Sequence, residues 1–318
     1  MRSQLLTVLT LLILASTLSV VTATVTATMT ASTNLKASQP EPLAQVFVIV
    51  LENRGFDQVI GNPNLPNFNR LAKTYGLASQ FYGEAHPSLP NYVALIAGDT
   101  FGSDSNDPSQ RFTGPTIASQ LEAKGLTWRA YMESIPSPGF TGPYGGNPVL
   151  YAKKHNPFML FPSIALNPKI KNQVVGLNAL ESDLKAGRAP TFSFIVPNLC
   201  NDLHGAPSCP LGAKLDRSGD AFLGRLVTRI MGSSAWSGNA AIVVTFDEGD
   251  YPKVAPNALD QGGHLPTVVI ARLGVRGLNS STSYDHYSLL RTLEDGWGLT
   301  ALGHAAQARS MTEFFSGR

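Results

Sequence analysis

The chain has 318 residues, of which 43% are hydrophobic and 14% are charged, and its formal net charge is +2. The hydrophobic share excludes a disordered chain, and the length allows a core somewhat above the usual size for one domain. Lys and Arg form no extended run, so the clustered basic patch typical of nucleic-acid binding is absent and no nucleic-acid partner is expected.

The first residues have the pattern of an export signal. Arg2 is the only charged residue before Lys36, and an apolar run from Leu5 to Val21 follows it. A charged start, a short apolar centre and small residues at Ala23 and Ala27 are typical of a cleaved signal peptide. The alternative is an uncleaved anchor, for which the run is short. We therefore predict a signal peptide over residues 1–24, a flexible linker over 25–44 and a single domain over 45–318. The mature protein should be secreted, with no stable membrane span.

Strands and helices are predicted to alternate along the rest of the chain. Continuous apolar runs predict buried strands, and amphipathic segments ended by Gly predict helices. Residues 139–168 are rich in Gly, Pro and aromatic residues and should form a long loop region beside a cleft. The alternation predicts an α/β fold with a mainly parallel central sheet flanked by helices on both faces. In chain order, the predicted elements are strand Val46–Leu51, helix Asn67–Tyr75, strand Leu77–Tyr82, helix Pro90–Ala97, helix Thr116–Lys124, strand Thr127–Tyr131, helix Leu177–Ala186, strand Phe192–Val196, helix Asp220–Met231, strand Ala240–Phe246, strand Thr267–Ala271 and helix Asp285–Asp295.

Polar residues follow three of the predicted strands directly. Glu52 and Asn53 follow the first, Asp202 and His204 come soon after Phe192–Val196, and Asp247-Glu248 follow Ala240–Phe246. Ligands of open α/β sheets bind beyond the carboxyl ends of the strands. A single carboxylate there is often only a helix cap, but three coincident cases favour a site. Carboxylates this close together repel one another unless a cation lies between them. Hard oxygen ligands with some His suit Ca²⁺, Mg²⁺, Mn²⁺, Fe or Zn²⁺.

Ser88 lies just before the helix that is predicted to begin at Pro90. The backbone N–H groups at a helix N-terminus attract anions, and a hydroxyl beside a metal can attack phosphorus. The alternative is that Ser88 merely caps the helix.

The two cysteines, Cys200 and Cys209, lie close together in a loop that contains Pro and Gly. Two thiols cannot supply the four ligands of a structural zinc site. In an oxidising compartment a disulfide is favoured over two free thiols.

Five short motifs of the chain, taken in order, resemble a known family. That family is the bacterial phosphoesterase family of secreted acid phosphatases and phosphocholine-type phospholipases C, related to the alkaline phosphatase superfamily. The likeness covers Val46 to Trp297 and is to the small secreted acid phosphatases that act on phosphoinositides. It implies an alkaline-phosphatase-like fold and a phosphoesterase domain over 45–318. The motifs are Glu52-Asn53-x-x-Phe56-Asp57, His86-Pro87-Ser88-x-Pro90-Asn91-Tyr92, Asn198-x-x-Asn201-Asp202-x-His204, Thr245-x-Asp247-Glu248-Gly249 and Asp285-His286-Tyr287-Ser288.

The resemblance also implies residue roles. Ser88 would be the nucleophile that forms a phosphoserine intermediate, Asn91 would bind a phosphoryl oxygen, and His204 would act near the leaving group. A His204 that must be protonated, with an ordinary pKa of ~6.5, predicts an activity optimum below neutral pH. The residues implied to hold a divalent or ferric ion are Glu52, Asn53, Asp247, Glu248 and His264, and those implied to contact the substrate are His86, Asp202 and His155.

The predicted function is a secreted, metal-dependent phosphomonoesterase. Its substrate would be a phosphate monoester, either a small molecule or a lipid headgroup. One alternative is a phospholipase C-type phosphodiesterase, in which the same kind of nucleophile attacks phosphorus. Another is a non-catalytic exported binding module. A serine esterase is disfavoured because the chain has no Gly-x-Ser-x-Gly elbow.

Overall fold

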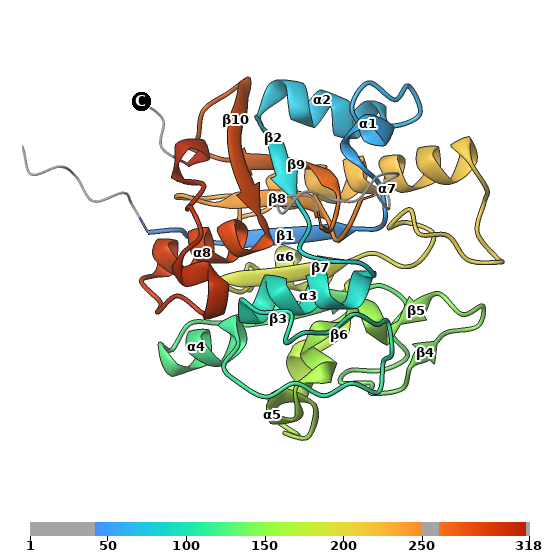
Figure 1. Cartoon of the computed structure of the whole chain (residues 1–318), viewed down its shortest axis with the longest axis vertical. Coiled ribbons are helices and arrows are strands. Elements are labelled where there is room, and N and C mark those ends of the chain that lie inside the picture. Colours follow the sequence, from blue (N-terminus) through green and yellow to red (C-terminus); the bar gives the residue numbers. More distant parts are fainter. Residues whose placement is uncertain (1–41, 250–260, 316–318) are drawn as a thin grey trace, which may run out of the picture. The chain divides into compact units, whose positions relative to one another are not determined.

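The computed structural model describes residues 42–249 and 261–315. The predicted signal peptide and nearly all of the predicted linker lie outside these ranges. Within them, an eight-stranded sheet runs through the centre in the order β10-β2-β9-β8-β1-β7-β3-β6, with helices around it (Figure 1). The strands are β1 (Val46–Leu51), β2 (Gly76–Tyr82), β3 (Trp128–Met132), β6 (Val174–Gly176), β7 (Phe192–Val196), β8 (Ala241–Phe246), β9 (His264–Ala271) and β10 (Leu278–Asp285).

The sheet is mainly parallel, as the sequence predicts. Strand β1 pairs in parallel with β7 on one side and with β8 on the other. Strand β9 pairs antiparallel with both of its neighbours, β8 and β2. The carboxyl ends of β1, β7 and β8 therefore meet at one edge of the sheet.

The helices pack around this sheet, with α2 against α7 and α3 against α8. The predicted loop region over 139–168 contains the small hairpin of β4 (Tyr144–Gly145) and β5 (Tyr151–Ala152). The α-helices are α1 (Phe56–Val59), α2 (Pro66–Thr74), α3 (Ser88–Ala97), α4 (Ile117–Ala123), α5 (Pro162–Ala165), α6 (Leu177–Lys185), α7 (Ala213–Met231) and α8 (His286–Trp297), and the 3-10 turns are Lys153–His155, Pro157–Leu160, Lys171–Gln173, Gly303–Ala306 and Thr312–Phe314.

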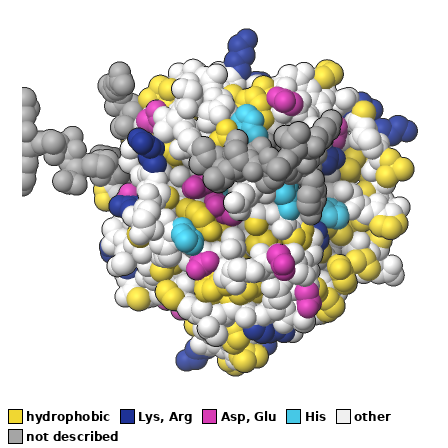
Figure 2. Space-filling model, in the orientation of Figure 1, with side chains coloured by type: hydrophobic (Ala, Val, Ile, Leu, Met, Phe, Trp, Pro, Cys, Tyr) yellow, Lys and Arg dark blue, Asp and Glu magenta, His cyan; other side chains and the backbone are white. Residues whose placement is uncertain are grey.

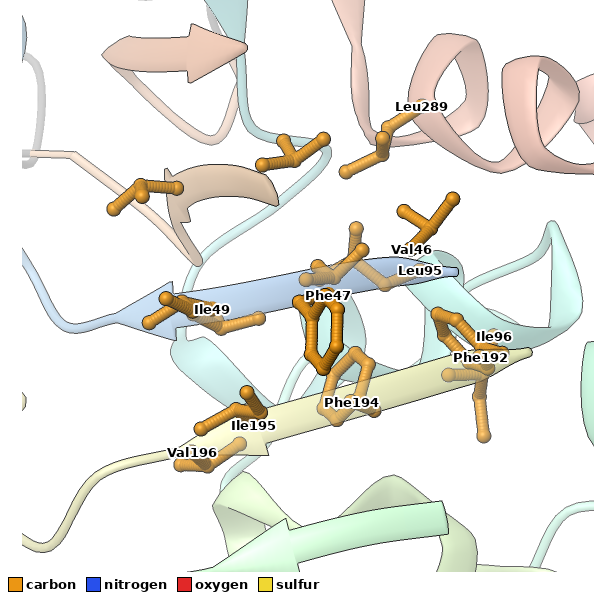
Figure 3. Packing of buried hydrophobic residues seen from close by; sticks show 14 of the residues in the cluster. Val46, Phe47, Ile49, Leu95, Ile96, Phe192, Phe194, Ile195, Val196 and Leu289 are labelled. Atoms are coloured by element: carbon orange, nitrogen blue, oxygen red, sulfur yellow. The ribbon is translucent and has the colours of Figure 1, made fainter. Parts of the chain in front are cut away.

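The core lies between the central strands and the helices. Every residue of β1 is buried, and so is every residue of β7 and β8. Figure 3 shows Phe47 of β1 and Phe194 of β7 in this cluster, together with Ile96 of α3. Strands that are buried on both faces are continuous apolar runs in the sequence. These three strands could therefore be predicted from the sequence.

Candidate active site

The carboxylates that follow β1 and β8 meet at one edge of the sheet. The Asp247 N–H donates to the Leu51 carbonyl at 3.0 Å, which ties the ends of the two strands together. The backbone N–H of Asn53 donates to Asp247 Oδ1 at 3.1 Å, and its Nδ2 donates to Glu248 Oε1 at 2.8 Å. Glu52, Asp247 and Glu248 are all buried. The structure thus brings four of the predicted metal ligands together.

Ser88 is the first residue of α3, and its hydroxyl lies between two of these carboxylates. Its Oγ is 2.7 Å from Glu248 Oε1 and 3.3 Å from Glu52 Oε2. The N-cap position belongs to Pro87, and no side chain caps this end of the helix. The alternative that Ser88 serves as the helix cap is therefore wrong. Its hydroxyl is buried against acids at a helix N-terminus, where an anion is favoured.

Two ring side chains lie at the other oxygen of Glu52, and of the two only Tyr92 makes a hydrogen bond to it. The Tyr92 hydroxyl donates to Glu52 Oε1 at 2.5 Å, and His155 Nε2 lies 3.0 Å from the same atom. The rings of Tyr92 and His155 stack with centroids 5.3 Å apart. The sequence analysis assigned no role to Tyr92. Its position four residues after Ser88, on the same face of one helix, was the available signal.

Asp202 and His204 lie beside this group, in the loop that follows β7. The Asp202 carbonyl accepts from the Glu52 N–H at 2.8 Å, and Asp202 Oδ1 accepts from the His204 N–H at 2.8 Å. His204 Nδ1 is 2.8 Å from the Gly205 carbonyl, and Lys154 Nζ is 3.2 Å from His204 Nε2. A carbonyl only accepts and an ammonium only donates, so this arrangement is that of a neutral imidazole protonated at Nδ1. Lys154 is a contact that the sequence analysis missed, and no periodicity marks it.

His86, predicted to contact the substrate, reaches the acidic cluster directly. Its Nδ1 pairs with Glu248 Oε2, the oxygen that Ser88 does not contact. His86 and Ser88 therefore contact the two oxygens of the same carboxylate, that of Glu248.

Asn91 has a different setting from the predicted one. Its Oδ1 accepts from the N–H groups of Glu84 and Ala85 at 2.8 and 3.1 Å, and its Nδ2 donates to the carbonyls of Ala85 and Pro87 at 2.7 and 3.3 Å. Both donors are thus engaged by the loop that leads to Ser88. The structure shows Asn91 as a brace for that loop, and the predicted phosphoryl contact would require one of these donors to be released.

His264 also lies in another setting than the predicted one. Its Nε2 is 2.8 Å from the Ser79 carbonyl, and its ring stacks on Phe56 and Tyr82 with centroid distances of 4.5 and 5.2 Å. The contacts that hold this imidazole are with β2 and α1 rather than with the acidic cluster. The structure therefore gives no support to His264 as a metal ligand.

Burial shifts the proton affinities of the cluster strongly. Desolvation raises the pKa of Glu52 to about 8, and it raises the pKa values of Asp202 and Asp247 well above the usual range. Neighbouring carboxylates add to each of these increases. Desolvation also lowers the pKa of His155 far below its usual value and lowers that of His204. Desolvation favours the neutral form of an acid and of an imidazole alike, and it acts on the buried His155 and, more weakly, on His204, whose side chain is exposed. A cation bound among these carboxyl groups would lower their pKa values and favour the ionised forms.

The donor set fits a metal ion. Within the described ranges, Asn53 Oδ1, Asp202 Oδ2 and Asp247 Oδ2 are buried and have no hydrogen-bond partner. Buried polar atoms are rarely left unsatisfied in proteins, so three such acceptors in one cluster form a possible site for a cation. Ligand atoms of Glu52, His155 and His204 also lie within 4.8 Å of one another. Glu52 belongs both to this second group and to the predicted set of metal ligands. His155 belongs to the second group, although the sequence analysis predicted it as a substrate contact.

The loop that carries His204 is closed by a disulfide. Cys200 and Cys209 are bonded to each other, as the sequence analysis expects. The bridge limits the freedom of the segment that presents His204 to the cluster.

Comparisons with known proteins show which family the chain resembles. The model of the Phosphoesterase family matches residues 62–300. A phosphatidylinositol-3-phosphatase of Mycobacterium tuberculosis is 32% identical, over 88% of this chain and 86% of its own length. An acid phosphatase of Aspergillus fumigatus is also 32% identical, over 81% of this chain. The match spans 55% of the length of that fungal enzyme.

The fold has relatives among solved structures. A protein in the alkaline phosphatase superfamily from Vibrio parahaemolyticus superimposes with a TM-score of 0.61 at 15% identity, over 86% of this chain and 71% of that one. At that identity the likeness concerns the fold alone, and it confirms the predicted alkaline-phosphatase-like architecture. With a family model that matches most of its length, the chain belongs to the Phosphoesterase family.

Proposed function

We propose that this chain is a secreted, metal-dependent phosphomonoesterase that acts through a phosphoserine intermediate on Ser88. The observation that carries the proposal is the position of the Ser88 hydroxyl, 2.7 Å from Glu248 Oε1 and 3.3 Å from Glu52 Oε2 at a helix N-terminus. The similarity to an acid phosphatase and to a phosphatidylinositol-3-phosphatase supports the substrate class. Among the helices of the described residues, none combines the length and the hydropathy needed to cross a bilayer.

The residues that would hold the metal are Glu52, Asn53, Asp247 and Glu248. A bound cation would neutralise phosphoryl oxygens and favour the deprotonated hydroxyl. Asp247 and Asn53 direct unpaired oxygens into the cluster, and Glu248 spans Ser88 and His86.

The chain itself provides the positioning for attack. Ser88 Oγ bonds to phosphorus while the bond from phosphorus to the leaving oxygen breaks, and the hydroxyl proton passes to Glu248 Oε1, its hydrogen-bond acceptor. Attack of water on the phosphoserine then releases phosphate and returns the serine. The positive end of the α3 dipole favours the negative charge of the phosphoryl group, although the Leu89 N–H already donates to Asn106 Oδ1 at 2.9 Å and Pro90 has no N–H.

The leaving group departs beside His204 and Lys154. His204 is held neutral because its Nε2 accepts from Lys154 and because burial lowers its pKa. The expectation that a charged His204 produces an acid optimum therefore lacks support from the resting structure. In the proposed reaction the ammonium of Lys154 faces the charge that develops on the leaving oxygen.

The test is the variant Ser88→Ala with p-nitrophenyl phosphate as substrate. We expect turnover to fall by at least about a thousandfold, because removal of a nucleophile abolishes the covalent route. Ser193→Ala, at a buried serine of β7 away from the cluster, is the matched control and should keep its activity. The melting temperature of both variants should stay near that of the parent. Retained hydrolysis by a folded Ser88→Ala protein would remove Ser88 as the nucleophile.

A phosphodiesterase is the second candidate. A non-hemolytic phospholipase C of Pseudomonas aeruginosa is 25% identical over 62% of this chain. The parent protein assayed with p-nitrophenyl phosphate beside p-nitrophenyl phosphorylcholine distinguishes the two activities. Preference for the diester would replace the proposed monoesterase.

A further inference from the structure

Two neighbouring loops extend beyond the edge of the sheet where the site lies. One comprises residues 134–152 and includes the β4–β5 hairpin, and the other comprises residues 203–213 and leads into α7. At their bases the Leu199 N–H donates to the Leu150 carbonyl at 3.0 Å, and Lys154 contacts His204. Figure 1 shows both loops projecting to the right of the strand ends. We call these two loops together the loop rim.

The loop rim exposes large apolar side chains. Leu211 is 80% exposed, Tyr144 is 56% exposed and Val149 is 50% exposed. In the orientation of Figure 1, Figure 2 shows hydrophobic side chains along the same right-hand side of the molecule. Single exposed apolar residues are ordinary, but a group of them beside a functional site indicates an interaction surface. A small substrate bound at Ser88 does not explain these side chains, because they lie at loop positions that face solvent.

The charge pattern of the rim indicates the chemistry of its partner. Residues 134–152 contain no charged residue, and neither do residues 205–213. Two acids precede the loops directly in sequence, but Asp202 is buried and Glu133 accepts hydrogen bonds from Asn198 and Asn201. Of the lysines that follow the loops, Lys153 is buried, which leaves Lys154 after the first loop and Lys214 after the second. Lys214 is exposed, and so is Arg217 on the next turn of α7. Nearby Asp216 pairs with Arg54 at 3.6 Å. Apolar tips with cations behind them match an anionic lipid surface, into which apolar side chains insert while Lys and Arg meet the headgroups.

We propose that the loop rim docks on the surface of a bilayer that contains anionic phospholipid. Docking would bring a lipid phosphate headgroup to the edge of the sheet where Ser88 lies. This inference rests on the proposed phosphatase function and specifies the form in which the substrate is presented.

The test measures sedimentation of the full chain with vesicles. One set contains phosphatidylcholine and phosphatidylserine, and the other contains phosphatidylcholine alone. The variants are the double substitution Val149→Ser with Leu211→Ser, and separately Lys214→Glu. The matched control is Leu166→Ser, since Leu166 is 78% exposed but follows α5, outside the loop rim.

We expect the parent and Leu166→Ser to sediment with the anionic vesicles. The double variant and Lys214→Glu should bind these vesicles at least roughly tenfold more weakly than the parent. The double variant loses apolar burial, and Lys214→Glu loses cationic charge. All variants should hydrolyse p-nitrophenyl phosphate like the parent, since none lies in the catalytic cluster.

Equal vesicle binding by the parent and the rim variants would overturn the proposal, and so would an equal loss in Leu166→Ser. Self-association of the parent that Val149→Ser with Leu211→Ser abolishes, seen by light scattering without lipid, would also overturn it by identifying a second copy as the partner. A parent that binds vesicles but hydrolyses no phosphate ester would refute the proposed function while leaving the docking surface standing. The two failures are therefore distinguishable.

Discussion

At the scale of single residues, the site is a buried acidic cluster whose geometry depends on a few neutral donors. Glu52 accepts from Tyr92, and its carboxylate lies 3.3 Å from Ser88 Oγ and 3.0 Å from His155 Nε2. Tyr92 is fully buried, and its nearest acceptor is a carboxylate whose pKa burial raises to about 8. The phenol thus fixes one oxygen of Glu52 and leaves the other facing Ser88.

Tyr92→Phe tests this positioning role. Loss of a hydrogen bond to a carboxylate costs ~1.5–3 kcal/mol, so we expect kcat to fall by about tenfold to a hundredfold with a smaller change in KM. Tyr131→Phe is the matched control, because the Tyr131 hydroxyl donates to Asp183 at 2.8 Å, outside the cluster. The measurement is kcat and KM of both variants and the parent, from steady-state kinetics with p-nitrophenyl phosphate. An unchanged kcat in Tyr92→Phe would show that Glu52 needs no such support.

Sequence reasoning located residues better than it located their partners. Glu52, Asp247 and Ser88 were predictable because the end of a buried strand and the start of a helix leave clear signals in sequence. Whether an amide faces a ligand or its own loop depends on backbone hydrogen bonds that no spacing encodes. For that reason Asn91 and His264 have settings that their motifs did not indicate.

At the scale of elements, the strands missed by the sequence analysis are those at the edges of the sheet. Strands β6 and β10 end the strand order, and neither has the continuous apolar run of the central strands. Most residues of β10 are not buried, and β6 is only three residues long although both of its valines are buried, so neither strand gives that signal. The central strands were predictable within a residue or two, except that β9 begins at His264, three residues earlier than predicted.

Several helix boundaries differ from the predicted ones by a residue or two, and the differences at the start of α7 and the end of α8 have identifiable reasons. Helix α7 begins at Ala213, ahead of the Asp220 that was read as its start, because the Asp220 carboxylate instead accepts from the N–H groups of Asn67 and Phe68 at the start of α2. Helix α8 runs through Gly296 to Trp297, where Gly298 ends it with a φ of 61°. A side chain at Gly296 would meet Leu43 at 2.3 Å, so this glycine serves packing.

Helix α8 also carries a titratable group whose effect on stability can be measured. Glu294 is buried, its Oε1 accepts from the Leu302 N–H at 2.9 Å, and desolvation raises its pKa from 4.5 to about 7. The folded chain therefore binds the proton more tightly than the unfolded chain does. Stability from this group is fully present below pH 4.5 and is lost as the pH rises through about 7.

Glu294→Gln should flatten that pH dependence. The amide retains an acceptor for Leu302 and does not ionise, so we expect the variant to be more stable than the parent above neutral pH. Melting temperatures measured at several pH values between 4.5 and 7 provide the comparison. The exposed Glu181 of α6, changed to Gln, should leave the slope as it is. An identical slope in Glu294→Gln and the parent would contradict the assignment.

At the scale of the whole molecule, the acidic cluster joins distant parts of the chain. Glu52 follows β1, Asp202 follows β7 and Asp247 follows β8. Their mutual repulsion and desolvation oppose folding unless a cation is bound. An ion that binds only the folded chain therefore contributes stability as well as chemistry.

Removal of the metal should reveal both effects. We expect a chelator to abolish phosphatase turnover and to lower the melting temperature, and Asp247→Ala to lose bound metal by elemental analysis. Asp183→Asn is the matched control, because Asp183 is a buried carboxylate that pairs with Arg129 at 2.6 Å, away from the cluster. Full metal occupancy in Asp247→Ala would refute the ligand assignment.

The Cys200–Cys209 bridge links the redox state of the chain's surroundings to the covalent closure of a loop at the site. The covalent ring encloses the segment with Asp202 and His204, and Leu211 follows two residues after it. Glutathione and thioredoxin keep such thiols reduced inside a cell. A reduced copy would carry this segment without its covalent ring, held by hydrogen bonds such as that from the Glu52 N–H to the Asp202 carbonyl at 2.8 Å.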